Sequence, residues 1–135
     1  MTGSPEPGTA IARCHCGAVE AVAAFPSRFC AHCYCWSCRR THAAGVVTWI
    51  GFKRAQVRYT RGEDLLRAYE SSRGTVRRFC GACGTRFTFE SSHGAWADEV
   101  HLPLALFVTP VDREPAANSF AEERPAWAPF HEFAP

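Results

Sequence analysis

No hydrophobic run in this chain approaches the roughly 20 residues that a membrane-spanning helix requires. The N-terminal stretch from Met1 to Thr9 has neither a basic start nor an apolar segment, so it does not resemble a secretory signal. We therefore expect no membrane partner and a location in the reducing cytoplasm. In that compartment, clustered cysteines indicate metal binding or catalysis more often than disulfides.

The chain also has little excess charge of either sign. It carries 15 basic and 13 acidic residues, which gives a net charge of +2, and its arginines are scattered along the sequence. A nucleic-acid-binding domain normally has a strong and clustered positive charge. We therefore expect no nucleic-acid partner.

Helical periodicity is scarce, whereas short runs of β-branched and aromatic residues recur along the whole chain. This pattern predicts a small, mainly β fold. The expected strands cover residues 19–25, 28–35, 46–52, 57–60, 65–70, 75–79, 86–90 and 102–109. Pro103 predicts that the last of these strands lies at a sheet edge, because proline cannot donate a hydrogen bond to a neighbouring strand.

The length of 135 residues fits one domain with a hydrophobic core of its own. Residues 1–10 are rich in proline, glycine and threonine, and we expect a disordered tail there, ahead of a single domain at 11–135. Repeated prolines predict an irregular C-terminal segment, which Trp127, Phe130 and Phe133 would pack onto the domain. Exposed edge strands in a small β fold also allow a homodimer.

Cysteine, in contrast, is abundant, and seven of the 8 cysteines fall into three short motifs. Cys14-His-Cys16 and Cys80-Gly-Ala-Cys83 are two pairs separated by a large part of the chain, so only the fold can bring them together. Four thiolates form the closed tetrahedral site of a structural zinc, and we expect such a site here. The alternatives are buried free thiols or disulfides.

The third motif is Cys33-Tyr-Cys-Trp-Ser-Cys38, with thiols at its first, third and last positions. Cys33, Cys35 and Cys38 could hold a second zinc that keeps one coordination position open for a substrate. Alternatively, the C-x-x-C spacing of the last two cysteines forms a redox-active dithiol. In a third alternative, His32 or His42 completes a second structural site.

Cys30 is the one cysteine outside these motifs. If residues 28–35 form an extended segment, the side chain of Cys30 points away from Cys33 and Cys35, since side chains alternate between the two faces of a strand. A lone thiol of this kind more often behaves as a small hydrophobic core residue than as a ligand.

Arg39 and Arg40 follow Cys38 directly. Their charges either offset the negative charge of a thiolate cluster or are simply solvated. Trp36 either lines a pocket beside the three cysteines or belongs to the core. The six histidines share no spacing that indicates a catalytic set.

Four segments of the chain match, in order, the motifs of one known family: Cys14-His-Cys16-Gly-Ala-Val19, Cys33-x-Cys35-x-x-Cys38-Arg39-Arg40, Tyr69-Glu-Ser-Ser72 and Arg78-Phe-Cys80-Gly-x-Cys83-Gly-Thr85. They resemble the glutathione-dependent formaldehyde-activating enzyme family, which also contains centromere protein V. The resemblance covers about residues 11–90. Where many relatives have a His-Ile-x-x-x-(Arg/Lys)-x-x-x-Trp stretch, this chain departs from the pattern with Asn118-Ser-Phe-Ala-Glu-Glu-Arg-Pro-Ala-Trp127.

The resemblance implies a small zinc-binding β-sandwich of the Mss4-like type, with two zinc ions per chain, of which the second is the more labile. It assigns the structural zinc to Cys14, Cys16, Cys80 and Cys83, and the second, catalytic zinc to Cys33, Cys35 and Cys38. The implied activity is that of a carbon–sulfur lyase that condenses glutathione, or a similar thiol, with formaldehyde or a related aldehyde. Arg39 would contact the carboxylates of glutathione.

Other classes of function remain open, because formaldehyde and thiols also combine spontaneously. One is a thiol-binding or formaldehyde-carrying protein without catalysis, and another is a zinc-scaffolded protein-interaction module. A third is a dithiol redox protein, which predicts a reversible disulfide between Cys35 and Cys38 and no second metal. Counting zinc ions per chain, with and without glutathione, separates these classes.

Overall fold

The computed structural model describes residues 4–134. Short β-strands dominate this part of the chain, and its one α-helix is α1 (Trp36–His42). The strands are β1 (Thr9–Arg13), β2 (Glu20–Ala24), β3 (Phe29–Cys33), β4 (Val47–Lys53), β5 (Val57–Arg61), β6 (Leu66–Ser72), β7 (Thr75–Cys80), β8 (Arg86–Ser91), β9 (Glu99–Pro103) and β10 (Asn118–Ser119). Within residues 4–134, no helix has the length and apolar character needed to cross a membrane.

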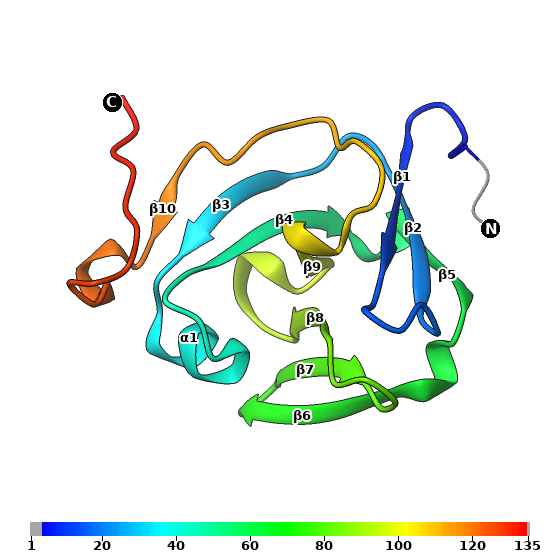
Figure 1. Cartoon of the computed structure of the whole chain (residues 1–135), viewed down its shortest axis with the longest axis horizontal. Helices are drawn as coiled ribbons and strands as arrows, with labels where there is room; N and C mark the ends of the chain where they lie inside the picture. The colour runs from blue at the N-terminus through cyan, green and yellow to red at the C-terminus, as the bar shows by residue number, and fades with distance from the viewer. Residues whose placement is uncertain (1–3, 135) are drawn as a thin grey trace.

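The strands form two sheets, so the predicted mainly β fold is confirmed. β1, β2 and β5 make a three-stranded sheet, and the other seven strands form a second sheet in the order β10-β3-β4-β9-β8-β7-β6. In Figure 1 the large sheet curves from β10 at the upper left round to β6 at the bottom, and the small sheet stands at its right-hand end. The helix α1 lies between the two arms of this curve, beside β3 and β7 (Figure 1).

Most of the expected strands are present, and each of seven has ends within two residues of the prediction. These seven are β2, β3, β4, β5, β6, β7 and β8. Short runs of β-branched and aromatic residues were therefore a sufficient signal for most of them. Gly74 has a φ of +78°, which suits the tight turn that joins β6 to β7.

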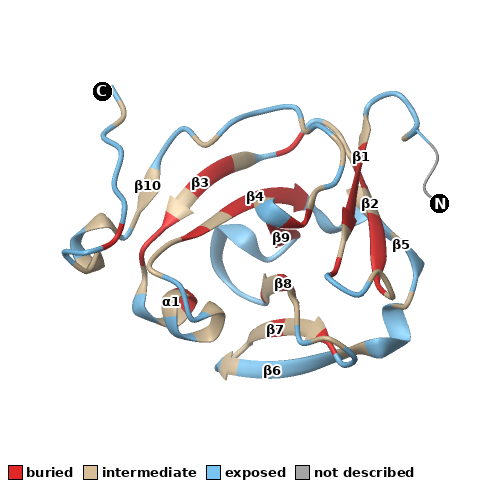
Figure 2. Ribbon diagram, in the orientation of Figure 1, coloured by how far each residue is buried: buried red, intermediate tan, exposed pale blue. Residues whose placement is uncertain are grey.

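The large sheet buries a different set of side chains on each of its faces. Ile50, Phe52 and Leu102 are fully buried in the main core, where they share a cluster with small residues of β1 and β2 such as Ala21 and Ala23. The opposite face carries Trp49, which packs in a smaller cluster with cysteines of the third motif. Figure 2 shows many buried residues in β1 to β4, whereas β6 is exposed along most of its length. Strand β9 is buried at all of its residues.

A bulge in β8 places two aromatic residues of this strand, Phe87 and Phe89, on opposite faces of the large sheet. The pairing of β7 with β8 shifts register between Arg78 and Phe79, so that Phe87 is left without a direct partner. An extra residue of this kind reverses the alternation of side chains along a strand. Phe87 therefore enters the main core, while Phe89 packs with Trp49 on the opposite face.

Two sequence-based expectations about regular structure were wrong. The strand expected at 102–109 at a sheet edge is instead β9, which pairs with both β4 and β8 inside the large sheet. Pro103 is compatible with that position because it is the last residue of the strand, after which the chain enters a 3-10 turn at Leu104–Leu106. Residues 36–42, where no regular structure was expected, form α1, a helix too short for periodicity to reveal.

The two ends of the chain also differ in detail from the expectation. Strand β1 begins at Thr9, and Ala10 is fully buried, so regular structure starts within the stretch expected as tail; residues 1–3 of that stretch lie outside the described part. Near the C-terminus, Tyr34 donates a hydrogen bond of 2.6 Å to the carbonyl of Pro129, and its ring contacts Phe130. Trp127, however, is 74% exposed and is not a buried anchor.

Candidate metal centres and substrate cavity

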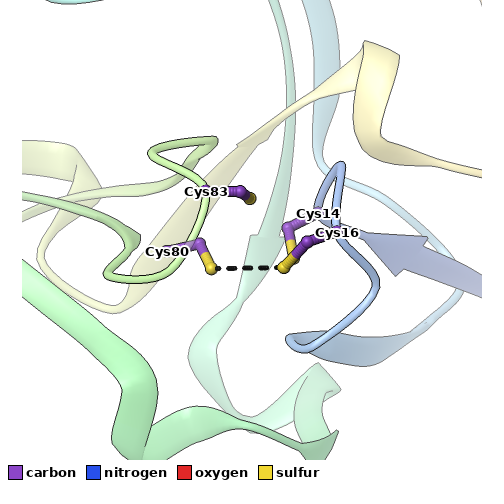
Figure 3. Close-up of side chains that lie close together, drawn as sticks. All are labelled: Cys14, Cys16, Cys80 and Cys83. Carbon is purple, nitrogen blue, oxygen red and sulfur yellow. Dashed lines mark hydrogen bonds between the residues drawn. The ribbon is translucent and has the colours of Figure 1, made fainter.

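The first candidate metal centre combines the two cysteine pairs that the sequence keeps far apart. The Sγ atoms of Cys14, Cys16, Cys80 and Cys83 all lie within 4.8 Å of one another. Figure 3 shows the pairs facing each other, with the sulfur of Cys16 3.9 Å from that of Cys80. Four sulfurs at about 2.3 Å from a tetrahedral zinc are about 3.8 Å apart, so the donor set fits this ion.

Left-handed glycines shape both loops that carry these cysteines. Gly17 has a φ of +80° and donates its N–H to the carbonyl of Cys14, and Gly84 has a φ of +82° and donates to the carbonyl of Cys80. Residues with a Cβ rarely adopt these angles. Thr85 links the loops, because its hydroxyl accepts a hydrogen bond from the N–H of His15.

The same threonine favours a thiolate at the metal centre. Hydrogen bonds from the side chain and backbone of Thr85 lower the pKa of Cys83 to about 5. Cys14 directly follows β1 of the small sheet, whereas Cys80 ends β7 of the large one. A metal at this centre would therefore tie the two sheets together.

The second candidate centre lies where β3 meets α1. Cys33 ends the strand, Cys35 is the N-cap of the helix, and Cys38 lies in the first helical turn. Their three sulfurs lie within 4.8 Å of one another, and those of Cys33 and Cys38 are 3.7 Å apart. The backbone N–H of Cys38 also donates to the sulfur of Cys35, so formation of the helix cap gathers the thiols.

This centre provides three protein ligands. Within residues 4–134, no histidine or carboxylate joins the cluster. His32 instead bonds the hydroxyl of Thr48, and His42 packs its ring edge-on against Trp49. Burial, reinforced by the charges of nearby arginines, lowers the pKa of His42 to about 4, so it is neutral at pH 7. The alternative in which a histidine completes a closed site is thus not supported by the geometry.

The three thiols open onto a cavity of about 160 Å³. Aromatic side chains form most of its wall, and Trp96 and Phe120 at the wall are nearly half exposed. The segment around Phe120 belongs to the stretch that departs from the family motif, so that stretch contributes to the cavity. The lining consists of Phe29, Ala31, Cys33, Cys35, Cys38, Trp49, Arg77, Phe89, Trp96, His101, Ser119 and Phe120.

The cysteine geometry agrees with a comparison of the sequence with family models. The model of the glutathione-dependent formaldehyde-activating enzyme family matches residues 9–123, which is most of the chain. The chain belongs to this family. No curated protein matches it in sequence.

A solved structure also shares the fold of this family member. The crystal structure of a Rhodobacter sphaeroides protein, determined as a structural genomics target, matches with a TM-score of 0.64 and 24% sequence identity. The match covers 81% of this chain and 99% of that chain. At this identity the similarity supports the fold alone.

In this member of the formaldehyde-activating family, a buried arginine contacts the three-cysteine centre. Nη1 and Nη2 of Arg77 each lie 3.6 Å from the sulfur of Cys38, and the guanidinium also donates to the hydroxyls of Ser37, Thr41 and Ser71. The residue is 5% exposed. Among the described residues, no carboxylate forms an ion pair with it.

A buried cation without a carboxylate partner is costly unless another anion balances its charge. The thiols of the centre are the groups placed to supply that anion. Hydrogen bonds from Cys33 and Cys38, together with the charge of Arg77, lower the pKa of Cys35 far below its ordinary value. Hydrogen bonds to Cys35 and Cys38 raise the pKa of Cys33, and the pKa of Cys38 is raised as well, so the site favours a single thiolate, at Cys35, before any ligand enters.

The other residues singled out in the sequence lie elsewhere. Cys30 faces the main core, as expected, and burial raises the pKa of its thiol to about 11. Arg39 donates from Nε to the carbonyl of Tyr34 at 2.9 Å and is absent from the cavity wall. Trp36 is 58% exposed, so the expectation of a buried core residue is wrong, and it lies outside this cavity.

Sequence reasoning missed two polar residues of the site, Arg77 and His101. Neither residue belongs to a motif with the spacing of metal ligands. Arg77 lies within, and His101 directly before, a segment whose sequence indicates only a β-strand. Only the pairing of β7, β8 and β9 brings them to the wall of one cavity.

Proposed function

We propose that this protein is a zinc-dependent carbon–sulfur lyase that reversibly joins glutathione, or a similar thiol, to formaldehyde at the three-cysteine centre. The observation that carries the proposal is a set of three sulfurs within 4.8 Å of one another that open onto a cavity rather than onto a fourth protein ligand. A three-ligand zinc site with a free position is the arrangement found in catalytic zinc centres. Family membership supports the choice of substrates.

In this proposal the two centres have separate roles. Cys14, Cys16, Cys80 and Cys83 hold a structural zinc, and Cys33, Cys35 and Cys38 hold the zinc of the reacting site. A bound zinc would supply acidity, because a thiol that coordinates this ion loses its proton. Arg77 balances the negative charge of the sulfurs with its buried guanidinium. A contact between Arg39 and the carboxylates of glutathione stays a prediction.

The size and polarity of the cavity suit a small aldehyde and a thiol group. A volume of about 160 Å³ is too small for a whole tripeptide, since drug-sized ligands occupy cavities of roughly 300 Å³ or more. The cysteinyl end of glutathione and formaldehyde would therefore enter, while the rest of the peptide stays at the surface. The aromatic wall limits access of water to the reacting atoms.

The first experiment is to count zinc ions per chain by native mass spectrometry, with and without glutathione. The second is to measure the exchange of glutathione and formaldehyde with S-hydroxymethylglutathione by NMR exchange spectroscopy, with the spontaneous reaction subtracted. We expect two zinc ions, retained glutathione and an exchange rate above background. Cys35→Ser should lose one zinc and the added rate, whereas Cys30→Ala, on the preceding strand β3 and facing the core, should keep both.

Each alternative function has its own outcome in these measurements. Retained glutathione with no increase in exchange rate would identify a binding or carrier protein. One zinc per chain and a Cys35–Cys38 disulfide would identify a dithiol redox protein. A Cys35→Ser variant that unfolds would make the second centre structural.

A further inference from the structure

One row of residues runs straight across five neighbouring strands on the cavity side of the large sheet. In register, this row is Phe29 of β3, Gly51 of β4, His101 of β9, Phe89 of β8 and Arg77 of β7. The row begins at the guanidinium that contacts the cysteine cluster. It reaches His101 after one aromatic residue, so both polar groups face the same cavity.

Aromatic rings hold His101 in a single orientation. Its ring stacks on that of Phe89 with centroids 5.5 Å apart, and it meets the rings of Phe29 and Trp96 edge-on at 4.7 and 5.5 Å. Gly51 makes room for this arrangement, because a Cβ there would lie 2.2 Å from Cε1 of Phe29. His101 is 5% exposed, so its position is set by packing rather than by solvent.

A buried carboxylate orients the imidazole from behind. Nε2 of His101 lies 3.0 Å from Oε1 of Glu99, which is itself 6% exposed and is absent from the cavity wall. Arg28 approaches the other carboxylate oxygen at 3.6 Å and balances its charge. An ionised carboxylate only accepts hydrogen bonds, so the proton of the neutral imidazole must be on Nε2. Nδ1 then carries a free lone pair, and it forms no hydrogen bond within residues 4–134.

Addition of a thiol to an aldehyde requires a group that moves one proton. The thiol must lose its proton to become a nucleophile, and the alkoxide that forms must gain one. An oriented, neutral histidine on the wall of a mostly aromatic cavity is suited to both steps. The cysteine cluster itself cannot serve, because its sulfurs are the proposed ligands of the metal.

We propose that His101 is the proton carrier of the reaction, and that Glu99 is its positioning residue; this inference rests on the proposed function. Nδ1 of His101 accepts the proton as the S–H bond of the substrate thiol breaks. The sulfur lone pair forms the S–C bond while the C=O π pair moves to oxygen. Nδ1–H then protonates that oxygen, so the imidazole is neutral again and no other reactant is consumed. The reverse reaction uses the same steps in the opposite order.

His101→Gln and Glu99→Gln test the two roles with the NMR exchange assay described above. We expect His101→Gln to lower kcat by about 100-fold or more, with the KM for glutathione and the zinc content unchanged. Glu99→Gln should lower kcat similarly while the protein still binds zinc, because a glutamine can donate to Nε2 and move the imidazole proton to Nδ1. His93→Gln is the matched control, since His93 is exposed and its imidazole bonds the loop carbonyl of Arg73, outside the cavity.

Chemical rescue separates proton transfer from a structural role. Free imidazole should restore part of the exchange rate of His101→Ala, in which the side chain is removed, and should leave His93→Ala unchanged. Wild-type kcat in both glutamine variants would overturn the proposal. So would a loss of kcat that is accompanied by an equal loss of bound zinc and is not rescued by imidazole.

A measurement on the wild-type protein keeps the inference testable if the variants do not fold. Nitrogen NMR should show the Nε2–H tautomer of His101, and glutathione should shift the signal of Nδ1 rather than that of Nε2. An Nδ1–H tautomer, or an Nδ1 signal that does not respond to glutathione, would overturn the role of His101. If wild-type protein binds glutathione at Nδ1 without accelerating exchange, the proposed function fails and the proton-carrier role fails with it.

Discussion

Replacement of Arg77 by methionine should weaken metal binding at the three-cysteine centre while leaving the four-cysteine centre intact. Methionine keeps an unbranched side chain that can replace the aliphatic part of the arginine, but it lacks the guanidinium, which lies 4.9 Å over the ring of Phe89. What the substitution removes is the positive charge 3.6 Å from the sulfur of Cys38. A zinc ion with three thiolate ligands still has one excess negative charge, and that charge would lose its buried counter-ion.

Two estimates set the expected loss of zinc affinity in Arg77→Met. Two unit charges about 4 Å apart attract each other by about 4 kcal/mol at the effective dielectric constant of about 20 that suits protein sites. This is an upper limit, because water and neighbouring dipoles rearrange after the charge is removed. Loss of a group that contacts metal ligands typically lowers affinity by about 10- to 100-fold, which equals about 1.4 to 2.8 kcal/mol. We expect the fall in zinc affinity to lie in this range.

Competition with a chromophoric chelator measures the two centres separately, since the closed four-thiolate site should release its metal last. Arg40→Met is the matched control, because Arg40 belongs to α1 and follows Cys38 by two residues but is exposed over the ring of Trp36. An unchanged affinity in Arg77→Met would refute the argument that Arg77 balances a thiolate cluster. An equal loss in Arg40→Met would show that general surface charge, not the buried contact, sets the affinity.

Three further predictions concern other parts of the molecule. Cys16→Ser should lower the melting temperature strongly, whereas Cys35→Ser should not. The reason is that a four-thiolate zinc contributes on the order of 10 kcal/mol to folding. Equal melting temperatures of the two variants would contradict this prediction. Gly51→Ala should destabilise the fold by about 1 to 3 kcal/mol in chemical denaturation, since the added methyl group overlaps the ring of Phe29. Unchanged stability would mean that the ring of Phe29 moves freely. Cys30 should resist alkylation by iodoacetamide at pH 8 in the folded protein. Burial raises the pKa of its thiol to about 11, and the thiol stays protonated below that pH. Mass spectrometry after labelling checks this, and rapid modification of Cys30 would contradict it.

Local chemistry made several parts of this structure predictable. Strands β4 and β7 were found because β-branched and aromatic residues occur in short runs there. The helix α1 was missed because its seven residues are too few for a hydrophobic period, and because its N-cap is a cysteine rather than a common capping residue. The position of β9 inside the sheet was missed because Pro103 suggested an edge, although a proline at the last residue of a strand interrupts no pairing.

The sequence by itself determined which thiols lie together locally. A C-x-C or C-x-x-C spacing brings two sulfurs together whatever the rest of the chain does, and this is why each group of cysteines could be proposed as metal ligands from spacing. Only the fold brings the pair Cys14 and Cys16 to the pair Cys80 and Cys83. Only the tertiary structure decided what surrounds the second set. Arg77 and His101 come from strands far from Cys38 in sequence, and a single arginine or histidine leaves no periodic signal. The position of Arg77 and His101 on the wall of one cavity with the cysteines depends on the register of five strands and on one bulge in β8. The register is set by the packing of the whole sheet.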